Sequence, residues 1–302
     1  MCYFKVFIQI LEDLHVRKKR LISQTSSGSQ PVKIHQVPYV VNILMNSLPA
    51  CGGSILSEYV IITAAHCFDD HTGKYSILSG SIYVDQGTHH SIKRILIYPH
   101  FHPKKYGNDL ALFSISPAID FARSTNRKIL LYNGHVPPNT LGTVSGWGSI
   151  GLGRATYFKG GMVFPKVLRS ITVPTISEEQ CWRDVAQHCQ EDEHEITNKV
   201  ICAFDRIEGK RCSYGDSGGP LVVNGQLAGI MAWGLENEAG PDVFMNLSHP
   251  AYRNWILSNM EHSLFNSPII RDKIRDEVSR RVRDEVSRRV RDEVSRRVRD
   301  EV

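Results

Sequence analysis

Three residue types that can carry out nucleophilic catalysis occur in this chain, each inside a short and distinctive motif. Ser217 lies in the run Gly-Asp-Ser-Gly-Gly-Pro, His66 in Thr-Ala-Ala-His-Cys, and Asp109 in Gly-Asn-Asp-Leu-Ala-Leu. A serine hydroxyl is a poor nucleophile at neutral pH, so a base must take its proton as it attacks a carbonyl carbon. The imidazole of His66 has the right acidity for that base, and it can later protonate a leaving amine.

The size and charge of the chain fit one large domain or two small ones. It has 302 residues, of which 41% are hydrophobic, enough for a substantial core. Residues 1–24 and 271–302 each carry a net charge of +3, which leaves −1 for residues 25–270 out of the formal total of +5. A near-neutral central region argues against nucleic acid as a partner.

Short runs of β-branched and aromatic residues, bounded by glycine, proline, asparagine and serine, predict an all-β fold. The predicted strands span residues 37–44, 91–97, 110–115, 140–147, 166–173, 221–223 and 228–233. A capping box at residues 177–180 predicts a helix running toward His188. A second helix is predicted from Ser248, with Pro250 in its first turn. Many short strands with few helices favour barrels or a sandwich.

The order His, Asp, Ser, with each residue in its own motif, resembles the trypsin/chymotrypsin family of serine endopeptidases. The resemblance implies that Ser217 is the nucleophile and His66 the general base, with Asp109 fixing the tautomer and stabilising the imidazolium. It also implies an oxyanion hole formed by the backbone N–H groups of Gly215 and Ser217.

The resemblance covers residues 25–262 and implies two six-stranded antiparallel β-barrels. The first barrel would supply His66 and Asp109 and the second Ser217, with the catalytic cleft at their junction. A linker near residues 132–139 would cross between the barrels, and a C-terminal helix would end the domain.

Outside this domain, residues 1–24 are expected to form a signal-like or pro-like segment. Residues 263–302 form a charged tail built on the repeat Arg-Asp-Glu-Val-Ser-Arg-Arg-Val. Valines recurring every four residues drift around a helix and make no straight coiled-coil seam. The tail is therefore expected to be disordered or partly helical, and a partner-binding helix is the alternative.

Four of the seven cysteines match family disulfides, Cys51–Cys67 at the histidine loop and Cys181–Cys202 between the predicted helix and the strand before the serine loop. Both pairs indicate an oxidising compartment. For Cys212 two alternatives remain open, a bridge to Cys189 or a buried thiol.

The family also implies which residues meet the substrate. Counted from the nucleophile and from the strand that ends at Trp233, the substrate-binding positions are Arg211, Trp233, Gly234 and Asp242. Trypsin-like members carry an aspartate where Arg211 stands. We expect Arg211 to pair with Asp242, which would favour apolar or aromatic substrate side chains. Unpaired, Asp242 would favour basic side chains and Arg211 acidic ones.

Two departures from the family bear on activity. Active members begin, after cleavage, with Ile-Val-Gly-Gly or a close variant, and the new N-terminal ammonium binds the carboxylate at the position of Asp216. Residues 25–28 read Thr-Ser-Ser-Gly here, although a basic run ending at Arg20 offers another cleavage point. Ala232 stands where the family has a serine that helps to orient the aspartate.

The sequence therefore predicts a secreted, monomeric serine endopeptidase that acts on protein or peptide substrates, with protein protease inhibitors among its partners. Residues 1–11 resemble a short signal peptide without a small-residue cleavage site, so secretion rests mainly on the cysteines and the family. The expectation includes no membrane span, no cofactor and no metal. The alternative function is a catalytically impaired homologue that acts as a binding or regulatory module.

Overall fold

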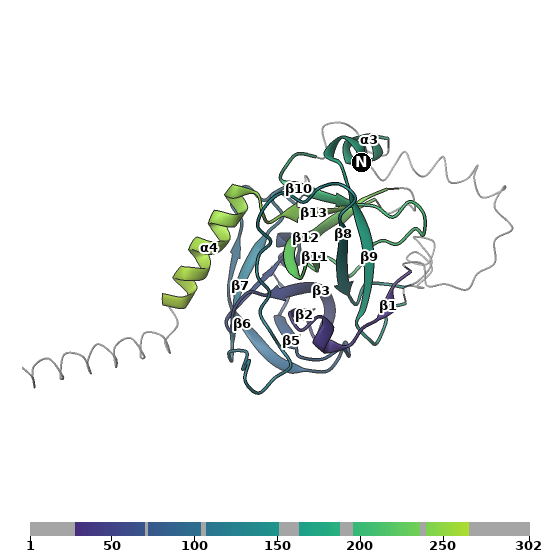
Figure 1. The fold of residues 1–302 in the computed structure, drawn as a ribbon. Helices are drawn as coiled ribbons and strands as arrows, with labels where there is room; N and C mark the ends of the chain where they lie inside the picture. Colours follow the sequence, from purple (N-terminus) through teal and green to yellow (C-terminus); the bar gives the residue numbers. More distant parts are fainter. Residues whose placement is uncertain are drawn as a thin grey trace, which may run out of the picture. The chain divides into compact units, whose positions relative to one another are not determined.

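The computed structural model describes residues 28–69, 72–103, 107–150, 163–187, 196–235 and 240–265. The chain divides into two compact units, Met1–Ile256 and Leu257–Val302. The first unit contains the two β-barrels that carry the predicted site (Figure 1).

The first barrel is closed by six antiparallel strands in the order β2-β3-β4-β7-β6-β5. These strands are β2 (Val40–Met45), β3 (Leu48–Ile55), β4 (Val60–Thr63), β5 (Tyr75–Ser79), β6 (Thr88–Ile97) and β7 (Ala111–Ser116). Branched side chains such as Ile43, Ile61 and Ile77 are fully buried in it, as expected where short β-branched strands enclose a core.

The second barrel has six further antiparallel strands and closes where β8 pairs with β9. These strands are β8 (Leu141–Gly146), β9 (Arg169–Ile176), β10 (Val200–Ala203), β11 (Pro220–Val223), β12 (Gln226–Gly234) and β13 (Asp242–Asn246). The short strand β1 (Gln30–Pro31) pairs with the first two residues of β9. The predicted architecture of two six-stranded barrels is thus confirmed, and the predicted linker lies between β7 and β8.

Within the described residues there are two α-helices, α3 (Glu178–Ala186) and α4 (Pro250–Phe265), and two short 3₁₀ helices, η1 (Ile34–Gln36) and η2 (Ala65–Phe68). Helix α3 begins where the capping box predicts, because the Ser177 hydroxyl accepts a hydrogen bond from the backbone N–H of Gln180. No helix in the described ranges is long and apolar enough to cross a membrane.

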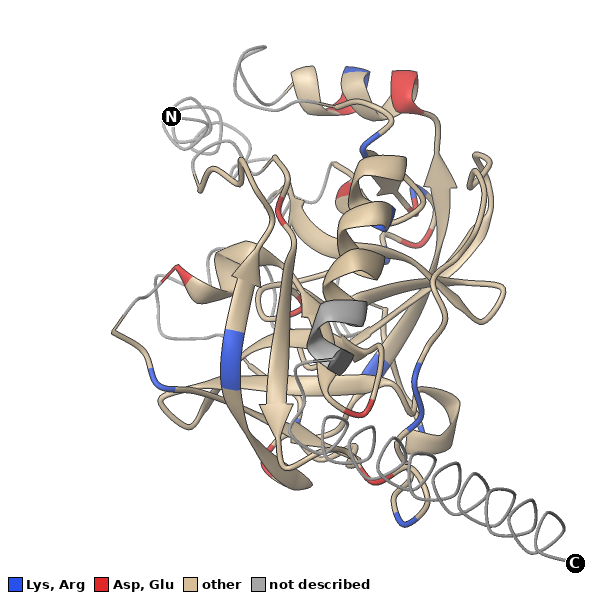
Figure 2. Ribbon diagram, turned by 90° about the vertical axis from the view of Figure 1, so that its left-hand side faces the viewer, with Lys and Arg blue, Asp and Glu red and all other residues tan. Residues whose placement is uncertain are grey.

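Charged residues are scattered over both barrels in the view of Figure 2, where blue and red segments occur on many different elements. This dispersion agrees with the near-neutral charge counted for residues 25–270. No single-sign surface dominates this view, so the electrostatics of the site depend on individual buried groups.

Candidate active site

Ser217 stands in a turn just before β11 of the second barrel, and its backbone is held by the first barrel. The carbonyl oxygen of Ser217 accepts a hydrogen bond from the N–H of Gly52 on β3, at 2.8 Å. A Cβ on the next residue, Gly218, would lie 2.0 Å from Thr63 Oγ1 and 3.1 Å from Ala64 N, directly before η2. Only glycine fits there, so the sequence Ser-Gly lets the nucleophile loop of one barrel press against the histidine segment of the other.

The backbone on the N-terminal side of Ser217 leaves two N–H groups, those of the predicted oxyanion hole, without an acceptor in the described part of the chain. Gly215 has φ +98°, a conformation that side-chain-bearing residues rarely adopt. Asp216 N–H and Gly219 N–H are used locally, by Ser213 O and Asp216 O. Among the described residues, no acceptor takes the N–H of Gly215 or of Ser217, so both remain available to an incoming oxyanion.

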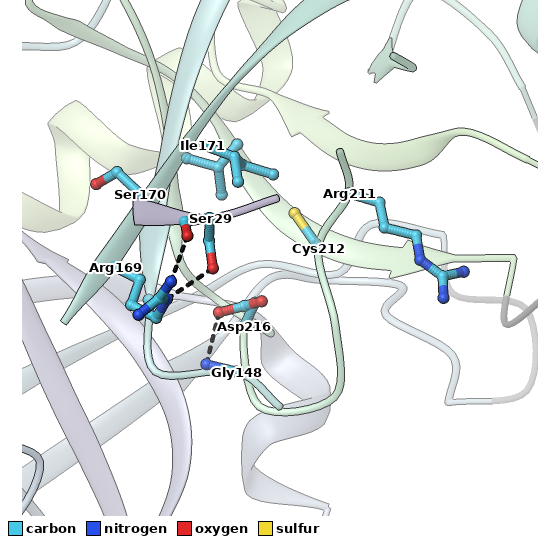
Figure 3. Close-up of a pocket in the computed structure, with 10 residues that line it drawn as sticks. Ser29, Gly148, Arg169, Ser170, Ile171, Arg211, Cys212 and Asp216 are labelled. Atoms are coloured by element: carbon cyan, nitrogen blue, oxygen red, sulfur yellow. Dashed lines mark hydrogen bonds between the residues drawn. The ribbon is translucent and has the colours of Figure 1, made fainter. Parts of the chain in front are cut away.

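The side chain of Asp216 lines a pocket, which is shown in Figure 3. Its carboxylate accepts hydrogen bonds from Gly148 N at 2.8 Å and from Ser213 N at 2.9 Å. Burial raises the pKa of Asp216 to about 6, and the two N–H donors offset this only in part.

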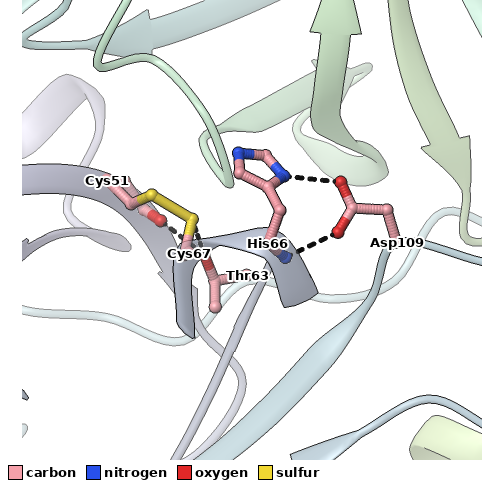
Figure 4. Close-up of a disulfide and its surroundings, with 6 residues drawn as sticks. Cys51, Thr63, His66, Cys67 and Asp109 are labelled. Atoms are coloured by element: carbon pink, nitrogen blue, oxygen red, sulfur yellow. Dashed lines mark hydrogen bonds and ion pairs between the residues drawn. A yellow bond between two sulfur atoms is a disulfide. The ribbon is translucent and has the colours of Figure 1, made fainter. Parts of the chain in front are cut away.

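His66 and Asp109 form the other half of the site (Figure 4). His66 lies on η2, directly after β4, and Asp109 lies in the turn before β7. His66 Nδ1 is 2.7 Å from Asp109 Oδ2, and the backbone N–H of His66 donates to Asp109 Oδ1 at 2.9 Å. The Asp109 side chain is fully buried and that of His66 is 20% exposed, so the second ring nitrogen of the imidazole, turned away from Asp109 in Figure 4, is left for another partner.

The electrostatic environment of His66 suits a base. Burial lowers the pKa of His66, but the hydrogen bond and charge of Asp109, with a smaller contribution from Asp69, raise it more, so the pKa lies above 6.5. No hydrogen bond joins the Ser217 hydroxyl to His66 in the described part of the chain. Catalytic hydrogen bonds are often long without substrate, so the absence of this bond does not argue against the predicted pairing of Ser217 with His66.

The turn that carries Asp109 is supported by aromatic residues. Asn108 has φ +56°, and its side-chain oxygen accepts a hydrogen bond from the Tyr252 hydroxyl at 3.1 Å. The Tyr252 ring packs edge-on against Tyr98, with centroids 4.9 Å apart. The first turn of α4 therefore fixes the backbone that positions the carboxylate.

Ala232 is buried on β12 and offers no hydroxyl to the site. Within the described residues, both hydrogen bonds to the Asp109 carboxylate come from His66. The contact that a serine would make in other family members is therefore missing without loss of the His66–Asp109 pair.

The expected ion pair between Arg211 and Asp242 is wrong. Asp242 Oδ2 instead accepts the backbone N–H of Cys212 at 2.7 Å, and a Cβ on Gly234 would lie 2.8 Å from Asp242 Oδ1. None of the ion pairs in the described ranges includes Arg211, whose side chain extends away from Asp216 and Cys212 in Figure 3. The backbone N–H of Cys212 thus takes the place at Asp242 Oδ2 that we expected the Arg211 guanidinium to occupy.

Asp242 is consequently a buried acid without a bound cation among the described residues. Burial raises the pKa of Asp242 to about 6; the Cys212 hydrogen bonds and the charge of Arg211 lower it, and Asp216 raises it. Trp233 and Gly234 lie beside it, because β12 pairs with β13 through Trp233↔Val243 and Gly234↔Asp242.

Both disulfides that the family resemblance implies are present, and one of them is drawn in Figure 4. Cys51–Cys67 joins β3 to η2, and Cys181–Cys202 joins α3 to β10. Cys212 is a free, buried thiol, and burial together with Asp242 and Asp216 raises its pKa well above the ordinary value. Cys189, the alternative partner of Cys212, lies outside the described residues.

Sequence reasoning missed two residues of this region. The sequence predicts either a disulfide or a buried thiol for Cys212, and the thiol is what the structure has, but the sequence gives no sign that the Cys212 amide binds Asp242. Arg169 was not singled out at all, and it lines the pocket that holds Asp216. Its signal is a charged residue in the interior of the predicted strand 166–173, whose other charged residue, Lys166, stands at the end.

Comparisons with known proteins give one answer at the level of family. The family model described as Trypsin matches residues 26–256. A protein named Trypsin from Phaedon cochleariae is 28% identical over 242 residues, covering 78% of this chain and 88% of its own length. Trypsin zeta of Drosophila melanogaster is 30% identical over 266 residues, covering 82% and 90%.

Solved structures agree. A scabies mite inactivated protease paralogue has a TM-score of 0.69 and 28% identity, covering 78% of this chain and 97% of its own. Neuropsin, a serine protease of mouse brain, has a TM-score of 0.66 at 23% identity, covering 77% and 98%, and supports the fold alone. With its paired barrels, its two disulfides and a family match across residues 26–256, this chain belongs to the trypsin family.

Proposed function

We propose that this chain is a serine endopeptidase that hydrolyses peptide bonds through Ser217, His66 and Asp109. The observation that carries the proposal is the 2.7 Å hydrogen bond from His66 to a fully buried Asp109. That pair lies on the barrel to which the backbone of Ser217 is hydrogen-bonded. A buried carboxylate fixes the imidazole tautomer, so the outer ring nitrogen is free to accept a proton.

The reaction follows from these positions. Ser217 Oγ attacks the scissile carbonyl carbon while His66 takes the hydroxyl proton, and Asp109 stabilises the imidazolium. The carbonyl oxygen, now negative, accepts hydrogen bonds from Gly215 N and Ser217 N. His66 then protonates the leaving amine, and water hydrolyses the acyl-enzyme by the same route in reverse.

In this proposal the substrate side chain binds Asp242, and Trp233 and Gly234 line the pocket around it. Arg211 does not neutralise Asp242, so the reason to expect an apolar preference disappears. A buried carboxylate without a cation is unfavourable, and a lysine or arginine side chain from the substrate would relieve that cost. We therefore propose cleavage after basic residues, with Arg211 weakening this preference by charge repulsion.

Asp242→Asn tests this assignment. Asparagine keeps an oxygen for the Cys212 N–H but removes the charge. The ratio of kcat/KM for matched peptides with Lys or Arg against Phe or Tyr should fall on the order of 10²-fold, since losing one partner of a buried charge pair removes about 2–5 kcal/mol. Arg211→Gln is the matched control and should move the ratio the other way. A ratio that does not respond to Asp242→Asn contradicts the proposal.

Specific observations favour a second candidate, a non-catalytic homologue that serves as a binding or regulatory module. No cation of the described residues pairs with Asp216, and Ala232 lacks the serine hydroxyl. One structural relative is itself described as an inactivated protease paralogue.

A fluorophosphonate probe separates the two candidates, because it reacts only with a serine activated by its base and oxyanion hole. We expect Ser217 to be labelled in the purified chain and the label to map to the peptide that contains it. His66→Ala should lose the label while the protein still unfolds cooperatively. A chain that stays unlabelled both as purified and after N-terminal processing favours the binding module.

We propose that the protein acts in an oxidising, extracellular compartment as a monomer. The support is the pair of disulfides, each closing a short loop of the domain. Protein or peptide substrates, and protein inhibitors that occupy the same cleft, are its expected partners.

A further inference from the structure

A pocket adjoins the loop that carries Ser217, because Cys212 and Asp216 of that loop are among its lining residues. It is lined by Ser29, Gly146, Gly148, Arg169 and Asp216, among others (Figure 3). Every hydrogen bond of the Asp216 side chain inside the described residues comes from a backbone N–H. The loop that carries Ser217 is therefore anchored by a buried carboxylate to which the described part of the chain offers no counter-ion.

A buried Asp216 carboxylate without a nearby cation is energetically unfavourable. None of the ion pairs found within the described ranges includes Asp216. A buried carboxylate that is hydrogen-bonded but unpaired is less favourable than one beside a cation, and its pKa of about 6 reflects this. Besides the two arginines of the pocket lining, the ionisable groups near Asp216 are Cys212, whose raised pKa keeps the thiol neutral, and Asp242, whose negative charge cannot offset that of Asp216.

The side chain of Arg169 projects from β9 on the face of the sheet where Asp216 lies. Arg169 on β9 is directly opposite Gly146 on β8, and side chains of directly opposed residues project from the same face of a sheet. A Cβ on Gly146 would lie 2.2 Å from Asp216 Oδ1. The Arg169 side chain thus projects to the side of the sheet on which the carboxylate packs.

In the structure, the guanidinium of Arg169 is hydrogen-bonded to Ser29. Arg169 Nε donates to Ser29 Oγ at 2.8 Å, and Nη2 donates to the Ser29 carbonyl oxygen. Ser29 directly precedes β1, whose two residues pair with Ser170 and Arg169. Figure 3 shows Arg169, Ser29 and Asp216 gathered on one side of the pocket, whereas Arg211, the other arginine of the lining, extends away.

We propose that Arg169 is a positioning residue that supplies the positive charge for Asp216 and so keeps the oxyanion hole formed in the uncleaved chain. Its guanidinium exchanges the Ser29 oxygens for the Asp216 carboxylate, a charge-assisted pairing that neutral serine oxygens cannot match. The inference rests on the proposed protease function. It makes an N-terminal ammonium unnecessary, in a chain whose residues 25–28 lack the usual Ile-Val-Gly-Gly.

The test uses the full-length chain, with its intact mass confirmed before and after each assay. Wild type, Arg169→Gln and Arg169→Lys are compared by the rate of fluorophosphonate labelling at Ser217 and by kcat and KM on a peptide substrate. We expect uncleaved wild type to be labelled. Arg169→Gln should lose on the order of 10²-fold in kcat with KM little changed, as when an oxyanion-hole donor is lost. Arg169→Lys, which keeps the charge, should recover most of that loss.

Arg183→Gln is the matched control, because Arg183 is an exposed residue of α3 that pairs with Glu179, and its activity should equal that of wild type. Thermal unfolding of each variant identifies any that fails to fold. Should Arg169→Gln unfold, Arg169→Met takes its place and should show the same loss of kcat.

Three outcomes would overturn the inference. In the first, folded Arg169→Gln is labelled as fast as wild type. In the second, wild type is inert until its N-terminal segment is cleaved, so that the new ammonium supplies the charge while the protease function stands. In the third, no form of the chain is labelled, cleaved or uncleaved, and the proposed function fails together with the role of Arg169.

Discussion

Replacing Ser217 by alanine is expected to lower kcat for peptide hydrolysis by on the order of 10⁶-fold. The acyl-enzyme cannot form without Oγ, and only slow attack by water in the oxyanion hole remains. The fold should be unchanged, since Ser217 binds Gly52 through its backbone carbonyl, which alanine retains. Steady-state kinetics with a peptide substrate measures the loss, and thermal unfolding checks the fold.

The matched control for Ser217→Ala is the double variant Ser217→Ala/His66→Ala. The two groups act as a unit, so the second replacement should cost almost nothing further, whereas independent contributions would multiply. A single variant that keeps more than about a tenth of the parent kcat contradicts the assignment of Ser217 as nucleophile, since a loss of under 1.4 kcal/mol is too small for a missing covalent step.

Asp109→Asn is expected to lower kcat by about 10⁴-fold while leaving the geometry intact. The asparagine amide donates to His66 Nδ1 and forces the proton onto the outer ring nitrogen, which then cannot accept one from Ser217. The carboxylate also no longer raises the pKa of His66, so burial lowers that pKa. Residual activity should therefore persist to lower pH than in wild type, as the pH profile of kcat/KM would report.

Stability should change in a defined pH range in Asp109→Asn. The folded-state pKa of His66 lies above 6.5, so the His66–Asp109 pair stabilises the fold below pH 6.5, and this contribution disappears as pH rises through the raised pKa. The variant should lose stability mainly on the acid side. Asp69→Asn is the control, because Asp69 is exposed and contributes least to the shift; it should keep its turnover.

The sequence predicts the all-β class, seven strands and both helices, because those segments follow local rules of alternation and capping. Strand β3 escapes such rules, since Pro49, Gly52 and Gly53 interrupt its pattern. A Cβ on Gly52 would lie 3.1 Å from the Cα of Gly219, so a glycine is required at position 52 because a turn distant in sequence packs against it. The residues around Gly52 do not indicate that Gly219 will pack against it, so local patterns could not predict β3.

The candidate site divides in the same way. Motifs identify His66, Asp109 and Ser217 because each type of chemistry requires a particular residue. Counting from the motifs names Gly234 and Asp242 as substrate-binding positions, and the structure pairs them between β12 and β13, but counting cannot say which neighbour binds the Asp242 carboxylate. The amide of Cys212 does so, and the expected ion pair with Arg211 fails. The proximity of Arg169 to the Asp216 pocket could not be predicted, because it depends on the register of β8 against β9.

The Gly52–Ser217 hydrogen bond has a consequence for the life of the chain before it is fully folded. The first barrel holds the proposed base and its carboxylate, while the proposed nucleophile belongs to the second barrel and bonds the first through its backbone. If the chain is a protease, a fragment that ends before β11, or a molecule in which either barrel has opened, would lack an assembled catalytic centre. Incompletely folded molecules would then be unable to cleave one another.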